Sequence, residues 1–261
     1  MKPGFRFTQF FRLDSLVMKE VFALEIARRT VRIALHDRGA ADCFPEPLRP
    51  CPGEEYDVSL SDREMIRSRE TYSLAETDAI REYKMLLWPT ADYLLETGAS
   101  IVHCVSIDWH GRAWLLCAPS GTGKTTQFLR WRQVGGYDVR MINGDMSAVS
   151  MESDGRILVW DTPWRGKECW IGDPGPVPLG GVIFLEQAEH NELLRLNPGN
   201  ELHRIVKGIS GRPRTEHAAR MFAALADGIL RHPVWLLKNR GDAASAQMAL
   251  DAIRAEGSAD E

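Results

Sequence analysis

The sequence has few features that would place the protein in a membrane, at a structural zinc site or on nucleic acid. Its five cysteines include no CxxC pair, so a structural zinc site is not expected. No apolar run is long enough to span a bilayer, and the N-terminus lacks the apolar core of a signal peptide. A net charge of −4 over 261 residues offers no strongly basic surface for nucleic acid. We therefore expect a cytoplasmic protein without membrane or nucleic-acid partners.

One segment carries most of the functional information. The apolar run Trp114–Cys117 predicts a buried strand, and residues 127–131 have the character of a helix. Between them, Gly121 and Gly123 allow the backbone to curl so that successive N–H groups can face an anion. Strand, glycine loop and helix together form the context of a phosphate-binding loop (P-loop, Walker A). The residues predicted to hold ATP or another nucleoside triphosphate are Pro119, Ser120, Gly121, Thr122, Gly123, Lys124, Thr125 and Thr126.

Three residues in and after this loop are candidates for catalysis and metal binding. Lys124 would reach the β- and γ-phosphates, and the Thr125 hydroxyl would bind the accompanying Mg²⁺. A strand predicted over residues 139–143 delivers Asp145 at its carboxyl end, where ligands lie in open α/β sheets. Asp145 is therefore predicted to share the metal ion; the alternative is an ordinary turn aspartate.

A second polar loop, Asp161–Glu168, follows a predicted hairpin. Arg165 and Lys167 would offset the charge of a transferring phosphoryl group, because cations near that group stabilise its negative charge. Glu168 would orient the nucleophile. The alternative is a surface turn with Trp164 packed inward, and the local sequence does not separate the two.

Strand-like and helix-like patterns are mixed along the rest of the chain, which indicates an α/β fold. A proline-rich stretch over residues 43–53 follows two short strands, and Pro89 is expected to kink or break a helix over residues 75–97. Residues 100–107 are expected to form one strand that pairs with residues 113–117 as a hairpin. The two expected domains are an N-terminal lobe over residues 1–95 and a nucleotide-binding core over residues 96–261.

The block from about Glu96 to Asp145 resembles the catalytic domain of HPr kinase/phosphorylase, which shares its fold with phosphoenolpyruvate carboxykinase. The correspondence comprises a strand bearing His103, a hairpin turn, the P-loop, a helix and a strand ending in acid. Residues 162–168 and 182–191 are similar to HPr-kinase-like proteins beside peptide-modification gene clusters, including lasso-peptide kinases. The resemblance implies a mixed-sheet P-loop kinase core and self-association into a homo-oligomer. The chain shows no counterpart of the N-terminal domain of full HPr kinases, so residues 1–95 are expected to form a small α+β lobe packed on this core.

One departure from that family bears on the chemistry. HPr kinases carry two adjacent acids after this strand, and the first acts as the base; here that position is Gly144. The base would then be His103, Glu168 or Asp145 itself. The resemblance implies transfer of the γ-phosphoryl group to a serine-type hydroxyl of a peptide or small protein. A small-molecule acceptor, a decarboxylating carboxykinase, and a nucleotide-binding module without an acceptor are the alternatives.

Overall fold

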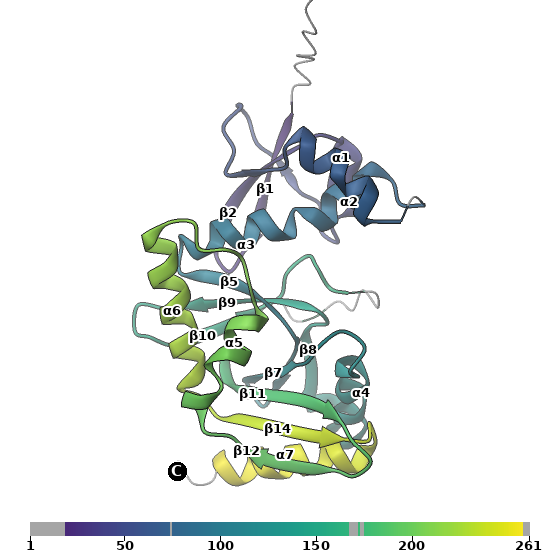
Figure 1. The fold of residues 1–261 in the computed structure, drawn as a ribbon, viewed down its shortest axis with the longest axis vertical. Coiled ribbons are helices and arrows are strands. Elements are labelled where there is room, and N and C mark those ends of the chain that lie inside the picture. Colours follow the sequence, from purple (N-terminus) through teal and green to yellow (C-terminus); the bar gives the residue numbers. More distant parts are fainter. Residues whose placement is uncertain (1–18, 74, 167–171, 173–174, 258–261) are drawn as a thin grey trace, which may run out of the picture.

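The computed structural model describes residues 19–73, 75–166, 172 and 175–257. The chain forms a mixed α/β structure with a four-stranded sheet near its start and a ten-stranded sheet after it (Figure 1). Both sheets combine parallel and antiparallel strand pairs. The predicted α/β class is confirmed at this level.

The four-stranded sheet is built around a tight hairpin. Strands β1 (Glu20–Ile26) and β2 (Arg29–Leu35) pair antiparallel, close to the strands that the sequence predicts. Ala27 and Arg28 form the two-residue turn with φ values of 51° and 61°, and positive φ at both positions suits the twist of a hairpin. The outer strands of this sheet are β3 (Arg49–Pro50) beside β1 and β4 (Val58–Ser59) beside β2.

Three helices follow this sheet. The first is α1 (Asp62–Thr71), which begins with a capping box. The expected helix over residues 75–97 is in fact two, α2 (Asp78–Met85) and α3 (Leu87–Leu95). Pro89 accounts for the division, because proline has no N–H to donate and is tolerated only in the first turn of a helix.

The ten-stranded sheet forms the larger part of the molecule and is covered by helices. Its strands are β5 (Ala99–His103), β6 (Val105–Trp109), β7 (Arg112–Cys117), β8 (Val139–Asn143), β9 (Met146–Met151), β10 (Ile157–Trp160), β11 (Val177–Gln187), β12 (Glu192–Arg195), β13 (Ile209–Ser210) and β14 (Val234–Asn239). Its helices are α4 (Lys124–Gly135), α5 (Leu202–Gly208), α6 (Glu216–Leu230) and α7 (Ala243–Gly257). Shorter 3-10 turns are η1 (Arg38–Cys43), η2 (Gly136–Asp138) and η3 (Pro198–Asn200). Among the described residues, no helix is both long and apolar enough to cross a bilayer.

The prediction of one strand over residues 100–107 is wrong, because the chain changes partners within it. β5 pairs with β9, whereas β6 pairs with β7 as the predicted hairpin. The break falls at Cys104, whose N–H donates to the carbonyl of Asp145 at 2.9 Å. This bond joins the end of β5 to the turn that leads into β9.

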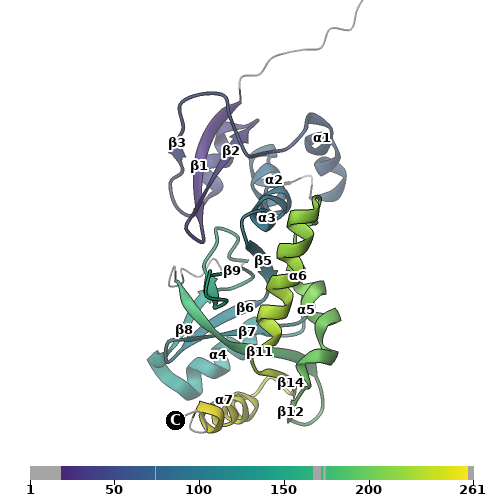
Figure 2. The same cartoon turned by 90° about the vertical axis from the view of Figure 1, so that its left-hand side faces the viewer.

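Helices cover both faces of the part of the sheet around β7, which gives three layers (Figure 2). The side chains of Trp114 and Leu116 pack with Phe128 of α4 and Leu250 of α7. Leu115 belongs to the cluster on the opposite face, which includes side chains of α5 and α6. A strand covered on both faces must be apolar at successive positions, as this run is.

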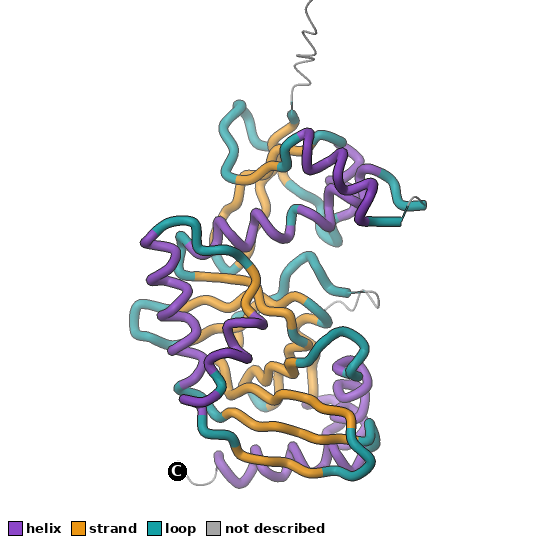
Figure 3. The backbone as a smooth tube through the Cα atoms, viewed as in Figure 1, coloured by secondary structure: helices purple, strands orange, loops and turns teal. Residues whose placement is uncertain are grey.

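A single cluster of buried side chains joins the two sheets. It extends from Phe22 of β1 through Leu94 of α3 to Trp160 of β10, and Figure 3 shows α3 between the sheets. Arg29 of β2 adds polar contacts, since its Nε and Nη2 donate to Thr97 Oγ1 at 2.9 Å and Thr97 O at 2.8 Å. The division into an N-terminal lobe and a core stays a prediction, because this cluster crosses it.

The ten-stranded sheet brings the carboxyl ends of β7 and β8 to the same edge. β6 lies between them and is antiparallel to both, so β7 and β8 run in the same direction. β7 leads into the glycine loop and α4, and β8 leads into Asp145. The functional candidates therefore meet at the edge where ligands bind in α/β sheets.

Candidate functional site

The glycine loop has the open backbone that phosphate binding requires. Gly121 and Gly123 have φ values of 82° and 101°, a region that side chains with a Cβ rarely adopt. A Cβ placed on Gly121 would meet no atom within 4 Å, so the outside of the loop is open. Gly123 is the N-cap of α4, and no side chain caps the first amides of that helix. Those amides and the positive end of the helix are available to an anion.

Lys124 lies back across this loop. Its side chain is buried, with the residue only 8% exposed. Nζ donates to the carbonyl of Ala118 at 2.9 Å, lies 3.5 Å from the carbonyl of Pro119, and lies 3.2 Å from His103 Nε2. Among the described residues, no carboxylate comes within 4.0 Å of this ammonium group. Its immediate partners are therefore an imidazole ring and main-chain carbonyls, and a phosphate oxygen could replace the carbonyls.

His103 links Lys124 to Asp145. Its Nε2 lies 3.3 Å from Asp145 Oδ1, so this one nitrogen contacts both the ammonium and the carboxylate. An unprotonated Nε2 can accept from Lys124, and a protonated Nε2 can donate to Asp145, but it cannot do both at once. The His103 and Asp145 side chains are about one-third exposed, at 32% and 37%. The three predicted residues thus come from three different parts of the chain and lie together, with His103 Nε2 able to carry a proton between the other two.

Asn143, which the sequence analysis did not single out, holds Asp145 in place. Its Oδ1 accepts the N–H groups of Asp145 and Met146, each at 2.8 Å. Its Nδ2 donates to Asp161 Oδ1 at 2.6 Å and to the carbonyl of Thr162 at 3.1 Å. The signal was present in the sequence, because asparagine two residues before a turn position commonly folds the backbone onto its own side chain.

Gly144 is where the resemblance expects an acid, and the structure gives a steric reason for glycine. A Cβ on Gly144 would lie 2.8 Å from the main-chain oxygen of Arg165. A Cβ on Gly166, whose φ is 79°, would lie 3.1 Å from Asp145 Cβ. The loop after β10 therefore packs its backbone directly on the turn that carries Asp145, and a side chain at Gly144 would force the two apart.

The side chain of Arg165 is directed to carboxylates. Its Nε donates to Asp161 Oδ2 at 2.8 Å, its Nη2 lies 3.2 Å from Glu46 Oε1, and the residue is 8% exposed. Burial raises the pKa of Asp161 above its ordinary value, although hydrogen bonds from Arg165 and Asn143 act in the opposite direction. This pairing was not foreseen, since the sequence analysis assigned Arg165 to the phosphoryl group.

Trp164 packs inward, as one of the two interpretations of this loop expects. Its residue is 6% exposed, and its Nε1 donates to the carbonyl of Tyr83 at 3.0 Å. The Tyr83 hydroxyl donates in return to the carbonyl of Pro163 at 2.8 Å. The loop is therefore fixed to α2. Lys167 and Glu168, the other predicted catalytic residues of this loop, lie outside the described residues.

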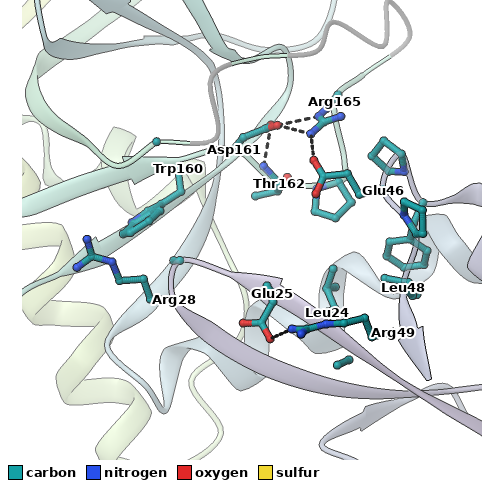
Figure 4. A pocket seen from close by; sticks show the side chains of 17 residues that line it. Leu24, Glu25, Arg28, Glu46, Leu48, Arg49, Trp160, Asp161, Thr162 and Arg165 are labelled. Carbon is teal, nitrogen blue, oxygen red and sulfur yellow. Dashed lines mark hydrogen bonds and ion pairs between the residues drawn. The ribbon is translucent and has the colours of Figure 1, made fainter. Parts of the chain in front are cut away.

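A cleft of about 420 Å³ opens between the β1–β2 hairpin, the proline-rich segment 44–49 and the loop after β10 (Figure 4). Its walls include Arg28, Glu46 and Trp160 together with the Asp161–Arg165 pair. The volume is within the usual range for ligand sites. The sequence analysis did not predict this cleft, because its walls come from three segments far apart in the chain.

The residues at the glycine loop could hold Mg²⁺ only together with the phosphates of a nucleotide. Among the described residues, no group of three or more His, Cys, Asp or Glu side chains is arranged to hold a metal ion. Mg²⁺ that accompanies a nucleotide is held by one or two protein oxygens together with phosphates and water, so it needs no such group. Thr125, in the first turn of α4, and Asp145 are the candidates for those oxygens.

Comparison with known proteins adds no family assignment. A scan against models of protein families found no match, and a search of curated proteins found no significant match.

Proposed function

We propose that the protein is an ATP-dependent phosphotransferase that acts on a serine-type hydroxyl of a peptide or small protein. The observation that carries this proposal is the meeting of Lys124, His103 and Asp145 beside an uncapped helix N-terminus and an open glycine loop. We infer that the ten-stranded sheet with this loop is a P-loop kinase core of the HPr kinase type. The resemblance of residues 96–145 to that family supports the inference.

In this proposal the loop binds and orients the nucleotide. Its main-chain amides and Lys124 bind the triphosphate, because Lys124 can exchange the carbonyls of Ala118 and Pro119 for phosphate oxygens. Thr125 and Asp145 would hold Mg²⁺, which would neutralise charge on the phosphates. Phosphoryl transfer needs mainly in-line geometry and such neutralisation, so few protein groups are required.

His103 is the proposed base. In its neutral form Nε2 accepts the proton of the acceptor hydroxyl as the oxygen attacks the γ-phosphorus and the bond to ADP breaks. The resulting imidazolium lies beside the Asp145 carboxylate, 3.3 Å away, which stabilises its charge. This arrangement supplies the base that Gly144 cannot. Arg165 is a positioning residue here, because its guanidinium is engaged by Asp161 and its backbone supports Gly144.

The test is transfer from labelled ATP with Mg²⁺, using three variants. Lys124→Ala should abolish transfer and leave the circular-dichroism spectrum and melting temperature unchanged. His103→Gln should lower the maximal rate at least about 100-fold, as loss of a general base does, while nucleotide binding measured by calorimetry persists. Lys207→Ala, an exposed lysine on α5, is the matched control and should retain full activity. Full activity of Lys124→Ala would refute the assignment.

A second candidate function is a nucleotide-binding module without an acceptor. The missing acid at Gly144 favours it, because the packing of Arg165 excludes a side chain at that position. The two functions differ in one measurement. The module binds Mg-nucleotide with a measurable heat but yields no phosphorylated product with any peptide, amino acid or HPr-like protein.

A further inference from the structure

The cleft of Figure 4 is built like a binding site for an extended chain. On one side lies β1, and opposite it lie the proline-rich segment 44–49 and the loop after β10. Asp161 and Arg165 in the far wall form an ion pair with side chains only 4% and 8% exposed. These contacts hold the two side chains of the wall together.

β1 has an unused hydrogen-bonding edge at the cleft. β3 pairs only with Phe22 and Ala23, so among the described residues no strand covers β1 beyond Ala23 on that side. The outward direction follows from the hydrogen bonds: the carbonyl of Val21 accepts from Cys51 on the β3 side. Residues two and four positions further along, Ala23 and Glu25, have their main-chain groups on that same side. Glu25 therefore offers a main-chain donor and acceptor to an added strand.

Among the described residues, one cation that lines the cleft, Arg28, has no acidic partner. Arg49 lies 3.1 Å from Glu25, and Arg165 is paired with Asp161 and Glu46. Arg28 is exposed in the hairpin turn, and its guanidinium carbon lies 5.2 Å from the centre of the Trp160 ring. No carboxylate within 4.0 Å of Arg28 is found among the described residues. A carboxylate entering the cleft would meet this guanidinium already oriented by the ring.

One layer of backbone, the loop after β10, separates the cleft from the proposed phosphate site. The side chain of Arg165 lines the cleft, whereas its main-chain oxygen lies against Gly144, the neighbour of Asp145. Thr162, also in the cleft wall, receives a hydrogen bond from Asn143, which positions Asp145. A chain held in the cleft would therefore lie against one side of the loop after β10, whose other side packs on the turn that carries Asp145, and a serine beyond the cleft would have to pass this loop to reach the proposed catalytic pair.

We propose that this cleft binds the phosphoryl acceptor as an extended polypeptide segment, which adds to the free edge of β1 and places an acidic side chain on Arg28. This inference rests on the proposed kinase function and names its substrate class: a peptide or tail with an aspartate or glutamate at a fixed distance from the phosphorylated serine. A protein acceptor would present such a segment as an unpaired tail or loop.

The experiment uses a peptide library with a central serine, one other position fixed in turn, Mg²⁺ and labelled ATP. The wild-type protein should select Asp or Glu at one position at least five-fold over Ala. Arg28→Glu should lose that selection and favour Lys or Arg at the same position, with unchanged heat of nucleotide binding. Arg195→Glu removes a cation that lies over the Trp235 ring at 4.9 Å on distant β12 but is already paired with Glu256; it is the control and should keep the acidic selection.

A second pair of variants tests the added strand. Glu25→Pro removes one outward N–H without removing a bond to β2, and should raise the KM for the selected peptide several-fold with little change in kcat. Glu25→Gln keeps the N–H and should behave as wild type; melting curves of both variants check that they fold.

The outcomes separate the two proposals. Phosphorylated peptides whose selection is the same in Arg28→Glu and wild type would overturn the cleft assignment and leave the kinase function standing. Nucleotide binding without any phosphorylated peptide would overturn both.

Discussion

Two buried cations, Lys124 and Arg165, occupy contrasting surroundings although each residue is 8% exposed. Lys124 contacts an imidazole and main-chain carbonyls, whereas Arg165 contacts two carboxylates. A buried charge is costly unless an opposite charge compensates it, so the Lys124 ammonium would be stabilised by an anion bound beside it. The Arg165 guanidinium already has carboxylates beside it, so a further anion would stabilise it less. Burial alone therefore does not distinguish these two cations; the charge of their partners does.

The largest expected effect comes from breaking the satisfied pair. Arg165→Met should lower the free energy of unfolding by about 3 kcal/mol, because it leaves the Asp161 carboxylate buried without its cation. Lys124→Met, measured in the same urea titration, should change it by less than about 1 kcal/mol, since no buried carboxylate loses a partner. Equal losses in the two variants would remove the distinction between them.

Gly144→Ala should have the next largest effect. The added Cβ would lie 2.8 Å from the Arg165 oxygen, and overpacking of this kind costs about 1–3 kcal/mol of unfolding free energy. Gly208→Ala is the control, because a Cβ there would meet only Val102 Cγ1 at 3.8 Å. Urea denaturation should show a loss for the first variant and none for the second. An unchanged free energy of unfolding in Gly144→Ala would mean that the loop after β10 can shift to accommodate the Cβ at little cost.

Tyr83→Phe removes the hydrogen bond to Pro163 and should cost about 1 kcal/mol of unfolding free energy. The loop after β10 would lose one of its hydrogen bonds to α2. We therefore expect faster local opening around Arg165 and no change around Lys124. Tyr56→Phe, at a residue that is 48% exposed, should cost almost nothing. Hydrogen exchange of the Arg165 amide, compared with that of the Thr125 amide, would show whether the effect is confined to one site.

The smallest effect is a pH dependence. Burial raises the pKa of Asp161, so the folded state holds this proton more tightly than the unfolded chain. The resulting stabilisation is complete below the ordinary carboxyl value of about 4 and is lost as the pH rises through the raised folded value. The unfolding free energy of wild type should therefore fall relative to that of Asp161→Asn as the pH rises from about 4.

Asp154→Asn provides a control of opposite sign. Hydrogen bonds from Arg156 lower the pKa of Asp154, so its contribution is present above the ordinary value and lost as the pH falls. Urea titrations at several pH values should give opposite trends for the two variants. A pH-independent difference between wild type and Asp161→Asn would contradict the assignment of a raised value.

The sequence predicted the features that depend on neighbouring residues. The strand–loop–helix around Lys124 and the β6–β7 hairpin follow from local apolar patterns and glycines, and the structure contains both. The direction of β8 was enough to place Asp145 at the correct edge. His103 was suggested by resemblance, and its contacts with Lys124 and Asp145 agree with that suggestion without testing its role.

Features that depend on distant partners could not be predicted. At the break, the Cys104 N–H donates to the carbonyl of Asp145, about forty positions later, and the apolar run around Cys104 does not reveal this partner. Arg165 lies 119 positions from Glu46, so no local pattern indicates that they pair. Gly144 is glycine because a loop backbone some twenty residues later packs on it, and only the folded structure brings the two together.

The apolar cluster that runs from Phe22 to Trp160 has a consequence for how a substrate gains access. Domains that close around their ligands pivot on a few exposed residues, with little apolar surface between the moving parts. Here a movement of one sheet relative to the other would expose the apolar cluster to water and break the Arg29–Thr97 hydrogen bonds. Under the proposal that the cleft binds an extended acceptor, the segment would therefore enter a preformed cleft without closure of the two sheets around it, which favours an unfolded tail over a compact domain.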